Sequence, residues 1–167
     1  VLLRVPANVI GDGVKTVREL VDEKNADPLR GDGSRSPLKK IALGEIEQLQ
    51  LKEQGLTPES VPTSGQIVQL RANSNISTGG DSIDMTDQMH ESYKALAVGI
   101  AHAMGAKVCG VDLIIPDLSQ PARPNLDSWG VIEANFNPMM MMHIFPYQGK
   151  SRRLTKNVIK MLFPEVK

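Results

Sequence analysis

The sequence has very little cysteine and few aromatic residues. Cys109 is the only cysteine among 167 residues, so no disulfide forms within the chain, as is usual for proteins of the reducing cytoplasm. Aromatic residues make up 4% of the chain, which leaves few rings on which nucleic-acid bases would stack. No apolar run reaches membrane-spanning length, and the first residues show no signal-peptide pattern. We therefore expect a cytoplasmic protein that binds neither nucleic acid nor membrane.

An excess of one charge is also absent. The 19 basic and 19 acidic residues give a formal net charge of zero, so no overall field would attract a polyanion. Hydrophobic residues at 41% and charged residues at 23% are typical of a globular protein, and the length suffices for a core. Since no repeat, low-complexity tract or long linker interrupts the sequence, we expect one compact unit.

The opening residues Val1–Pro6 have the composition of a strand interior and lack an initiator methionine. Natural chains rarely begin in this way. We expect a fragment whose partner sequence lies upstream, and the alternative is a polypeptide trimmed cleanly at a domain edge.

Two runs rich in valine and isoleucine, residues 107–115 and 129–138, flank a segment of turn-forming residues. This arrangement predicts an antiparallel pair of strands. Because side chains alternate between the faces of a strand, Glu133, Asn135 and Asn137 are expected to project from the same face.

Asp112 is a charged residue within the first of these two strands, where burial without a partner would be unfavourable. If the polar faces coincide, Asp112, Glu133 and Asn135 bring two carboxylates and an amide oxygen together. Such a set of oxygen ligands suits a hard divalent cation such as magnesium. A general acid and base, as in glycoside hydrolysis, is an alternative that leaves the amide unexplained. A solvated sheet face is the second alternative.

A polar loop follows the strand predicted over residues 65–71. It spans residues 72–81 and combines hydroxyls, amides and the glycines Gly79 and Gly80, which suit contacts with phosphate. Arg71, at the end of the strand, is placed for bidentate contact with a phosphate group. A plain connection between two elements is the alternative.

Capping patterns and helical spacing predict the remaining elements. One helix is expected from the capping box Thr16-x-x-Glu19 to Asn25, and a second along the apolar face Ala42, Leu43, Ile46 and Leu49 up to Gly55. A short helix is expected to start at Thr57-Pro58-Glu59. Two further helices are expected from Tyr93 to Met104, where Gly105 ends the helix, and over Leu154–Leu162 before Pro164. The four methionines Met139–Met142 are expected to line a short helical turn. Asn8–Gly13 is expected to form a turn, and a mobile loop whose backbone amides approach phosphate is the alternative. Arg30 and Arg35 of the loop 27–37 are expected to be solvated, with contact to an anion as the alternative.

Three ordered motifs together resemble the ATP-grasp ligases. They are Arg4–Gly13, Leu70–Gly80 with Asp84 and Thr86-Asp87, and Gly110-Val-Asp112 followed by Ile132-Glu-Ala-Asn135. The sequences of Glu133–Pro138 and His143–Gly149 are most similar to those of the glutathione synthetase domain of bifunctional glutamate–cysteine ligase/glutathione synthetases, and cyanophycin synthetase is the next most similar. The resemblance covers nearly the whole chain. It implies an α+β fold, the carboxyl-terminal lobe of an ATP-grasp domain, with a mainly antiparallel sheet and packed helices.

The resemblance also implies a role for particular residues. Asp112, Glu133 and Asn135 match metal ligands for magnesium or manganese, Arg71 matches an arginine that contacts the phosphates of ATP, and Arg4 resembles a second basic residue near the reacting group. Asn75, Gly79 and Gly80 match the loop that approaches the phosphates, while Asn137, Pro138 and Met139 fall where the family shapes the pocket for the incoming amine.

The implied activity is the joining of γ-glutamylcysteine and glycine through an acyl phosphate, which gives glutathione. The Gly-x4-Gly-Lys-Ser/Thr motif is absent, which argues against a P-loop nucleotide site. A cyanophycin synthetase-type peptide ligase and a non-catalytic binding module that retains the fold are the alternatives. Residues 1–167 are expected to be an incomplete ATP-grasp domain, inactive alone, whose upstream lobe and a glutamate–cysteine ligase domain precede Val1 in the same chain.

Overall fold

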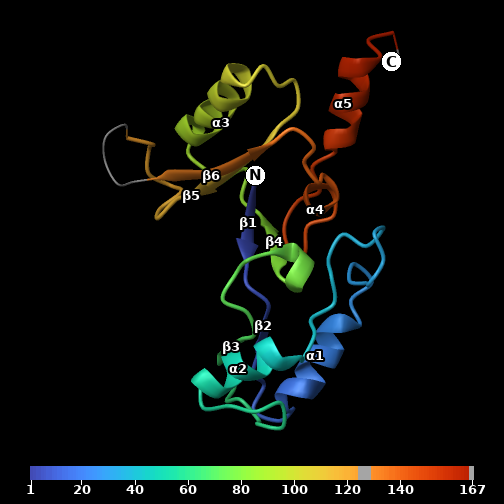
Figure 1. The fold of residues 1–167 in the computed structure, drawn as a ribbon, viewed down its shortest axis with the longest axis vertical. Helices are drawn as coiled ribbons and strands as arrows, with labels where there is room; N and C mark the ends of the chain where they lie inside the picture. The colour runs from blue at the N-terminus through green and yellow to red at the C-terminus, as the bar shows by residue number, and fades with distance from the viewer. Residues whose placement is uncertain (124–128, 166–167) are drawn as a thin grey trace. The chain divides into compact units, whose positions relative to one another are not determined.

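The computed structural model describes residues 1–123 and 129–165, and these form two compact units rather than the single unit expected from the sequence (Figure 1). The loop unit contains Leu2–Asp84 and Met141–Ser151. The hairpin unit contains Val1, Met85–Met140 and Arg152–Lys167. Each unit therefore draws on segments that are far apart in the sequence.

The loop unit contains two antiparallel strand pairs and three α-helices. Its elements are β1 (Leu2–Val5), β2 (Asn8–Ile10), α1 (Val17–Asn25), α2 (Glu45–Glu53), β3 (Ile67–Gln69), the 3-10 helix η1 (Ile76–Thr78), β4 (Asp81–Asp84) and α4 (Met141–Ile144). Strand β1 pairs with β4, and β2 pairs with β3. One expectation was wrong here, because Asn8–Ile10 is a strand and not part of a turn. The polar loop predicted over residues 72–81 contains η1 and ends at Gly80, and strand β4 follows from Asp81. Neither short strand had a hydrophobic alternation that the sequence alone could reveal.

The core of the loop unit is an apolar cluster built from α1, α2, β2, β3 and their flanks. It consists of Ala7, Val9, Val17, Leu20, Val21, Ile41, Leu51, Val68 and Leu70. The capping box predicted at the start of α1 is confirmed: the Glu19 N–H donates to Thr16 Oγ1 (3.3 Å), and the Thr16 N–H donates to Glu19 Oε2 (2.8 Å). These bonds satisfy backbone donors that have no partner within the helix.

The apolar face predicted for α2 was wrong. The helix buries Glu47 and Leu51, while Ile46 and Leu49 are 58% and 59% exposed. A buried glutamate contradicts the usual preference of charge for solvent, and Glu47 is tolerated because Arg71 neutralises it. The short helix predicted at Thr57-Pro58-Glu59 was also wrong, because Pro58 and Glu59 form a turn.

The hairpin unit contains α3 (Glu91–Ala103), β5 (Gly110–Ile114), β6 (Gly130–Asn135) and α5 (Leu154–Leu162). Strands β5 and β6 pair in antiparallel fashion as predicted, and α3 packs against β5. His90 caps α3, because its Nδ1 accepts the Ser92 N–H (3.2 Å), and Gly105 ends it with a φ of 67°. Among the described residues, the longest helices are too short or too polar to cross a bilayer.

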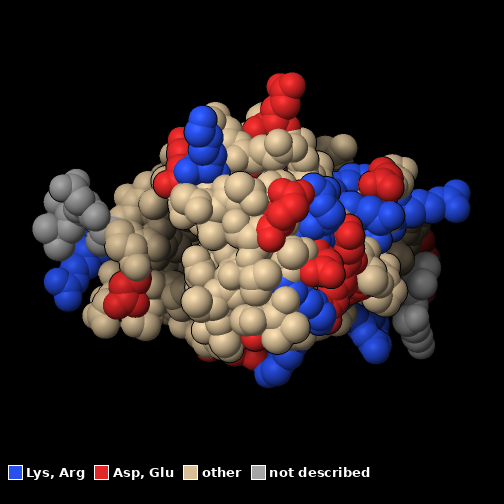
Figure 2. Space-filling model, turned by 90° about the horizontal axis from the view of Figure 1, so that it is seen from below, with Lys and Arg blue, Asp and Glu red and all other residues tan. Residues whose placement is uncertain are grey.

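The predicted helical turn of four methionines is half correct, since only Met141 and Met142 lie in α4. On the surface, Figure 2 shows Lys and Arg side chains next to Asp and Glu side chains on one face of the molecule. Neither sign dominates that face, in keeping with the zero net charge.

Candidate functional site

The residues expected to form the site fall into two groups, one in each unit. The loop unit holds Arg4, Arg71, Asn75, Gly79 and Gly80, and the hairpin unit holds Asp112, Glu133, Asn135, Asn137, Pro138 and Met139. Each group is built by the local pairing of its own unit.

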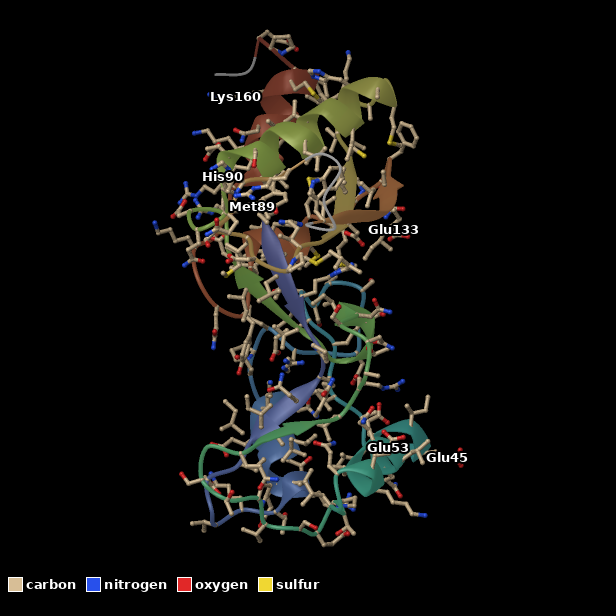
Figure 3. The ribbon with its side chains drawn as sticks, turned by 90° about the vertical axis from the view of Figure 1, so that its left-hand side faces the viewer. Glu45, Glu53, Met89, His90, Glu133 and Lys160 are labelled. Atoms are coloured by element: carbon tan, nitrogen blue, oxygen red, sulfur yellow. The ribbon has the colours of Figure 1, made fainter. Side chains whose placement is uncertain are left out.

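Strands β5 and β6 place Asp112 directly opposite Glu133, and Gly110 opposite Asn135. Directly opposite residues of an antiparallel pair share a face, with Cβ atoms about 4.5–5.5 Å apart. Asn135 lies two residues beyond Glu133 and therefore projects on the same side. Glu133 is exposed at the edge of the hairpin (Figure 3). The structure thus brings the two acids and the amide to one face of the hairpin.

A β-bulge follows this acidic pair. The register shifts after Asp112, so that Leu113 pairs with Val131 and Ile132 becomes the extra residue of β6. Bulges increase the local twist of a strand pair and change the direction in which neighbouring side chains point. No sequence pattern predicted this irregularity, which lies immediately beside the two carboxylates.

The amide of Asn135 is oriented by its neighbour. Asn135 Nδ2 donates to Glu133 Oε1 (3.0 Å), which turns the amide oxygen away from that bond. Among the described residues, no group of three His, Cys, Asp or Glu side chains is placed to hold a metal ion, so a site here needs the amide as its third ligand. Carboxylate and amide oxygens are the donors that Mg²⁺ and Mn²⁺ prefer. The set fits such an ion.

The segment after β6 folds back over the start of β5. The Cβ of Pro138 lies 2.9 Å from the position that a Cβ on Gly110 would occupy, so only glycine fits beneath this proline. Asn137, Pro138 and Met139 therefore lie at the same end of the hairpin as Asn135. The Met139 side chain is 53% exposed there.

In the loop unit, Arg71 lies two residues after the end of β3 and forms an ion pair with Glu47 of α2. The Arg71 side chain is 18% exposed and that of Glu47 is 2% exposed. The neighbouring Leu70 N–H donates to the Ala7 carbonyl (2.7 Å), which fixes the backbone before the arginine. Glu47 was not among the residues expected at the site, because its partner lies 24 positions away.

The two glycines of the polar loop are buried and make room for close packing. Gly79 has a φ of 92°, and a Cβ there would lie 2.9 Å from the Ile41 side chain. A Cβ on Gly80 would lie 2.8 Å from the carbonyl oxygens of both Asn75 and Val5. Asn75 itself is exposed at the start of η1. A direct contact of these residues with a nucleotide remains a prediction.

We expect Gly80→Ala to destabilise the 167-residue chain by roughly 1–3 kcal/mol, because its methyl group would press on two backbone oxygens. The urea midpoint of the circular dichroism signal measures this loss. Gly99→Ala is the matched control, since that helical glycine has nothing within 4 Å, and it is expected to be neutral or slightly stabilising. Equal midpoints for Gly80→Ala and the unchanged chain would disprove the packing role.

Arg4 lies on β1 opposite Ser82, and its neighbour Val5 lies opposite Asp81. This register places the half-buried Arg4 beside the end of the polar loop, where Gly80 packs on Val5. Arg4 and the polar loop are therefore close together in the loop unit. In the sequence, only the resemblance to a known family linked them.

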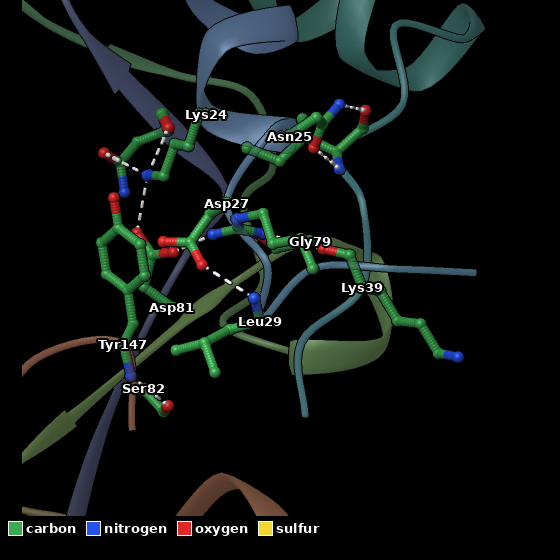
Figure 4. A network of polar contacts seen from close by, with 12 residues as sticks. Lys24, Asn25, Asp27, Leu29, Lys39, Gly79, Asp81, Ser82 and Tyr147 are labelled. Atoms are coloured by element: carbon green, nitrogen blue, oxygen red, sulfur yellow. Dashed lines mark hydrogen bonds and ion pairs between the residues drawn. The ribbon is translucent and has the colours of Figure 1, made fainter. Parts of the chain in front are cut away.

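A buried charge network that sequence reasoning missed lies beside this loop (Figure 4). Asp81 Oδ1 accepts a hydrogen bond from Arg30 Nη2, and Asp81 Oδ2 accepts one from Lys24 Nζ (2.7 Å). Arg30 also donates through Nη1 to the carbonyl oxygens of Gly79 (3.0 Å) and Lys39 (2.7 Å). The expectation that Arg30 is solvated was wrong, since its side chain is fully buried. Its partner lies 51 residues away, so no local pattern could identify the pair.

The ring of Tyr147 covers this network, with its centroid 5.3 Å from Lys24 Nζ and 5.4 Å from Arg30 Cζ. Burial lowers the pKa of Lys24, an effect that Asp81 opposes. Burial also raises the pKa of Tyr147, and the charge of Asp81 adds to that rise. The network fastens the loop of residues 27–41 to Gly79 and β4, and so shapes the polar loop.

The fold is an α+β fold with antiparallel strand pairs, as expected from the sequence. The crystal structure of a bifunctional glutathione synthetase from Pasteurella multocida matches 99% of this chain, with a TM-score of 0.90 and 83% sequence identity. The match covers 23% of that protein.

Curated relatives give the same result. Proteins named glutathione biosynthesis bifunctional protein GshAB from Pasteurella multocida, Mannheimia succiniciproducens and Enterococcus faecalis are 83%, 82% and 59% identical to this chain over 166 residues. The chain is thus similar over 99% of its length to these proteins, which confirms the expected resemblance, and it spans 22% of their length. No family model matches the sequence.

Proposed function

We propose that this chain supplies metal-binding and phosphate-binding residues to an ATP- and Mg²⁺-dependent carboxylate–amine ligase that joins γ-glutamylcysteine and glycine into glutathione. The observation that carries the proposal is the pairing of Asp112 with Glu133, with Asn135 on the same face, in a chain 83% identical to part of a bifunctional glutathione biosynthesis protein.

In this proposal, Asp112, Glu133 and Asn135 hold a Mg²⁺ or Mn²⁺ ion that carries the phosphates of ATP. The bound ion would neutralise the negative charge that phosphoryl transfer concentrates. Arg71 adds a guanidinium, whose forked donors match phosphate oxygens, and Arg4 supplies a second positive charge near the reacting group.

The proposed reaction has two steps. The γ-phosphoryl group of ATP passes to the carboxylate of γ-glutamylcysteine, which gives an acyl phosphate and ADP. The amine of glycine then attacks the acyl carbon, and phosphate leaves. No side chain acts as a covalent nucleophile, so the residues of this chain serve to position substrates and to stabilise charge. Asn137, Pro138 and Met139 are proposed to shape the pocket for glycine, and Asn75, Gly79 and Gly80 to approach the phosphates.

We further propose that the chain is the carboxyl-terminal part of an ATP-grasp domain within a longer cytoplasmic protein. The names of its relatives describe bifunctional proteins, and the chain matches 22% of their length. A glutamate–cysteine ligase domain in the same polypeptide would supply the dipeptide substrate. The residues that hold adenine are then expected in the preceding lobe.

A comparison of the complete gene product with the 167-residue chain tests this proposal. With ATP, Mg²⁺, γ-glutamylcysteine and glycine, the complete protein is expected to release ADP and form glutathione, whereas the isolated chain is expected to do neither. Omission of glycine is the control for uncoupled ATP hydrolysis. Turnover by the isolated chain would refute the division of the site between two lobes. Turnover only with aspartate, arginine and a peptide primer would indicate a cyanophycin synthetase-type ligase, and no nucleotide-dependent turnover would indicate a binding module.

A further inference from the structure

Glu47 is a buried acid whose two oxygens have different partners. Its Oε1 accepts a hydrogen bond from Arg71 Nε, and its Oε2 accepts the Gly44 N–H (3.0 Å) at the start of α2. The residue is 1% exposed. Because a buried carboxylate is stable only when it is paired, both bonds define the position of this side chain.

Gln54, the C-cap residue of α2, contacts the end of β3 at a second point. The Gln54 amide donates to the Gln69 carbonyl (2.6 Å) and accepts the Gln69 N–H (3.1 Å), so that it pairs with the strand as another backbone would. Glu47 and Gln54 are seven residues apart and lie on the same side of the helix. The helix therefore fixes the backbone of Gln69 and the side chain of Arg71 together.

The bond between Arg71 Nε and Glu47 determines which nitrogens of the guanidinium are available to bind a ligand. Glu47 binds Arg71 through Nε, the nitrogen that joins the guanidinium to the rest of the side chain. No other hydrogen bond or ion pair of the Arg71 guanidinium is found within the part of the chain that the structure describes. Its two Nη groups form the forked end that binds a phosphate in bidentate fashion.

We infer that Glu47 is a positioning residue, which holds Arg71 through Nε so that the two Nη groups face the phosphates of the nucleotide. The inference rests on the proposed function, in which Arg71 contacts those phosphates. Glutamine cannot replace Glu47 in this role, because a carboxamide has one acceptor oxygen and the site needs two, one for Arg71 and one for Gly44.

Steady-state kinetics of the complete gene product test the inference, with ADP release measured against ATP concentration. We expect Glu47→Gln to lower kcat/KM for ATP by about 10–100-fold, by analogy with the loss typical when a residue that orients a metal ligand is replaced. Glu47→Asp keeps two oxygens and is expected to retain more activity. Glu45→Gln is the matched control, since Glu45 lies in the same turn of α2, is exposed (Figure 3), and is expected to leave kcat/KM unchanged.

Double substitution separates a positioning role from a structural one. If Glu47 acts through Arg71, Glu47→Gln lowers kcat/KM no further in an Arg71→Ala background. Independent losses that multiply, or full activity of Glu47→Gln, would overturn the inference and leave the proposed function intact. An inactive wild-type protein, or an Arg71→Ala variant with full activity, would instead overturn the proposed function on which it rests.

Discussion

Glu133→Ala in the complete gene product is expected to lower Mg²⁺-dependent ADP release by about 10³-fold, which corresponds to roughly 4 kcal/mol of lost transition-state stabilisation. Glu133 lies opposite Asp112 and fixes the amide of Asn135, so its removal takes away one proposed ligand and releases another. The side chain is exposed, and the fold is therefore expected to survive the substitution.

The measurement is ADP release at increasing Mg²⁺ concentration, together with the circular dichroism spectrum of the variant. A higher Mg²⁺ requirement with an unchanged spectrum is the expected result. Glu91→Gln is the control, because Glu91 lies in the same unit and, among the residues that the structure describes, pairs only with Lys94 at the surface. Wild-type turnover and an unchanged Mg²⁺ dependence in Glu133→Ala would remove the metal site from this face of the hairpin.

Asp81→Ala is expected to destabilise the loop unit by about 3–5 kcal/mol. The substitution leaves the cations of Arg30 and Lys24 buried without their shared carboxylate, with side chains that are 0% and 12% exposed. Loss of one partner from a buried ion pair has an effect of this size, because the remaining charge is not solvated. The urea midpoint of the 167-residue chain measures the loss.

Asp32→Ala is the matched control for Asp81→Ala. Asp32 also pairs with a lysine, but the Lys40 and Asp32 side chains are 48% and 82% exposed, so the expected change is below about 1 kcal/mol. The idea fails if both variants unfold at the same urea concentration. A further variant, Arg30→Met, leaves Asp81 with Lys24 alone and is expected to be less harmful than Asp81→Ala.

Elements with strong local signals were predicted from the sequence. The capping box placed the start of α1, Gly105 marked the end of α3, and the two valine-rich runs gave the hairpin of β5 and β6. In each case the residues that determine the element lie within a few positions of it. The pairing of Asp112 with Glu133 joins two strands and is a longer-range property. Strand alternation nevertheless predicted that Glu133 and Asn135 share a face, so that Asp112 could lie only on the same face as these residues or on the opposite one.

The sequence-based predictions were wrong where residues distant in the sequence determine which side chain is buried. Helix α2 buries Glu47 rather than Ile46 because Arg71, on another element, offers a charged partner. Loop residue Arg30 is buried for the same reason, since Asp81 and Gly79 receive its donors. A reading of hydrophobicity along the chain assigns such charges to solvent, and it has no means of detecting a compensating charge from another segment.

The sequence by itself determined the antiparallel hairpin, most of the helices and the residue types available to bind a cation and a phosphate. Only the tertiary structure decided that residues 27–65 supply Arg30 and Glu47, which fix Gly79 and Arg71. It also decided the division into two units and the bulge beside Asp112. The physical reason is that local propensities depend on neighbours in the chain, whereas the burial of a charge depends on the partner that folding brings to it.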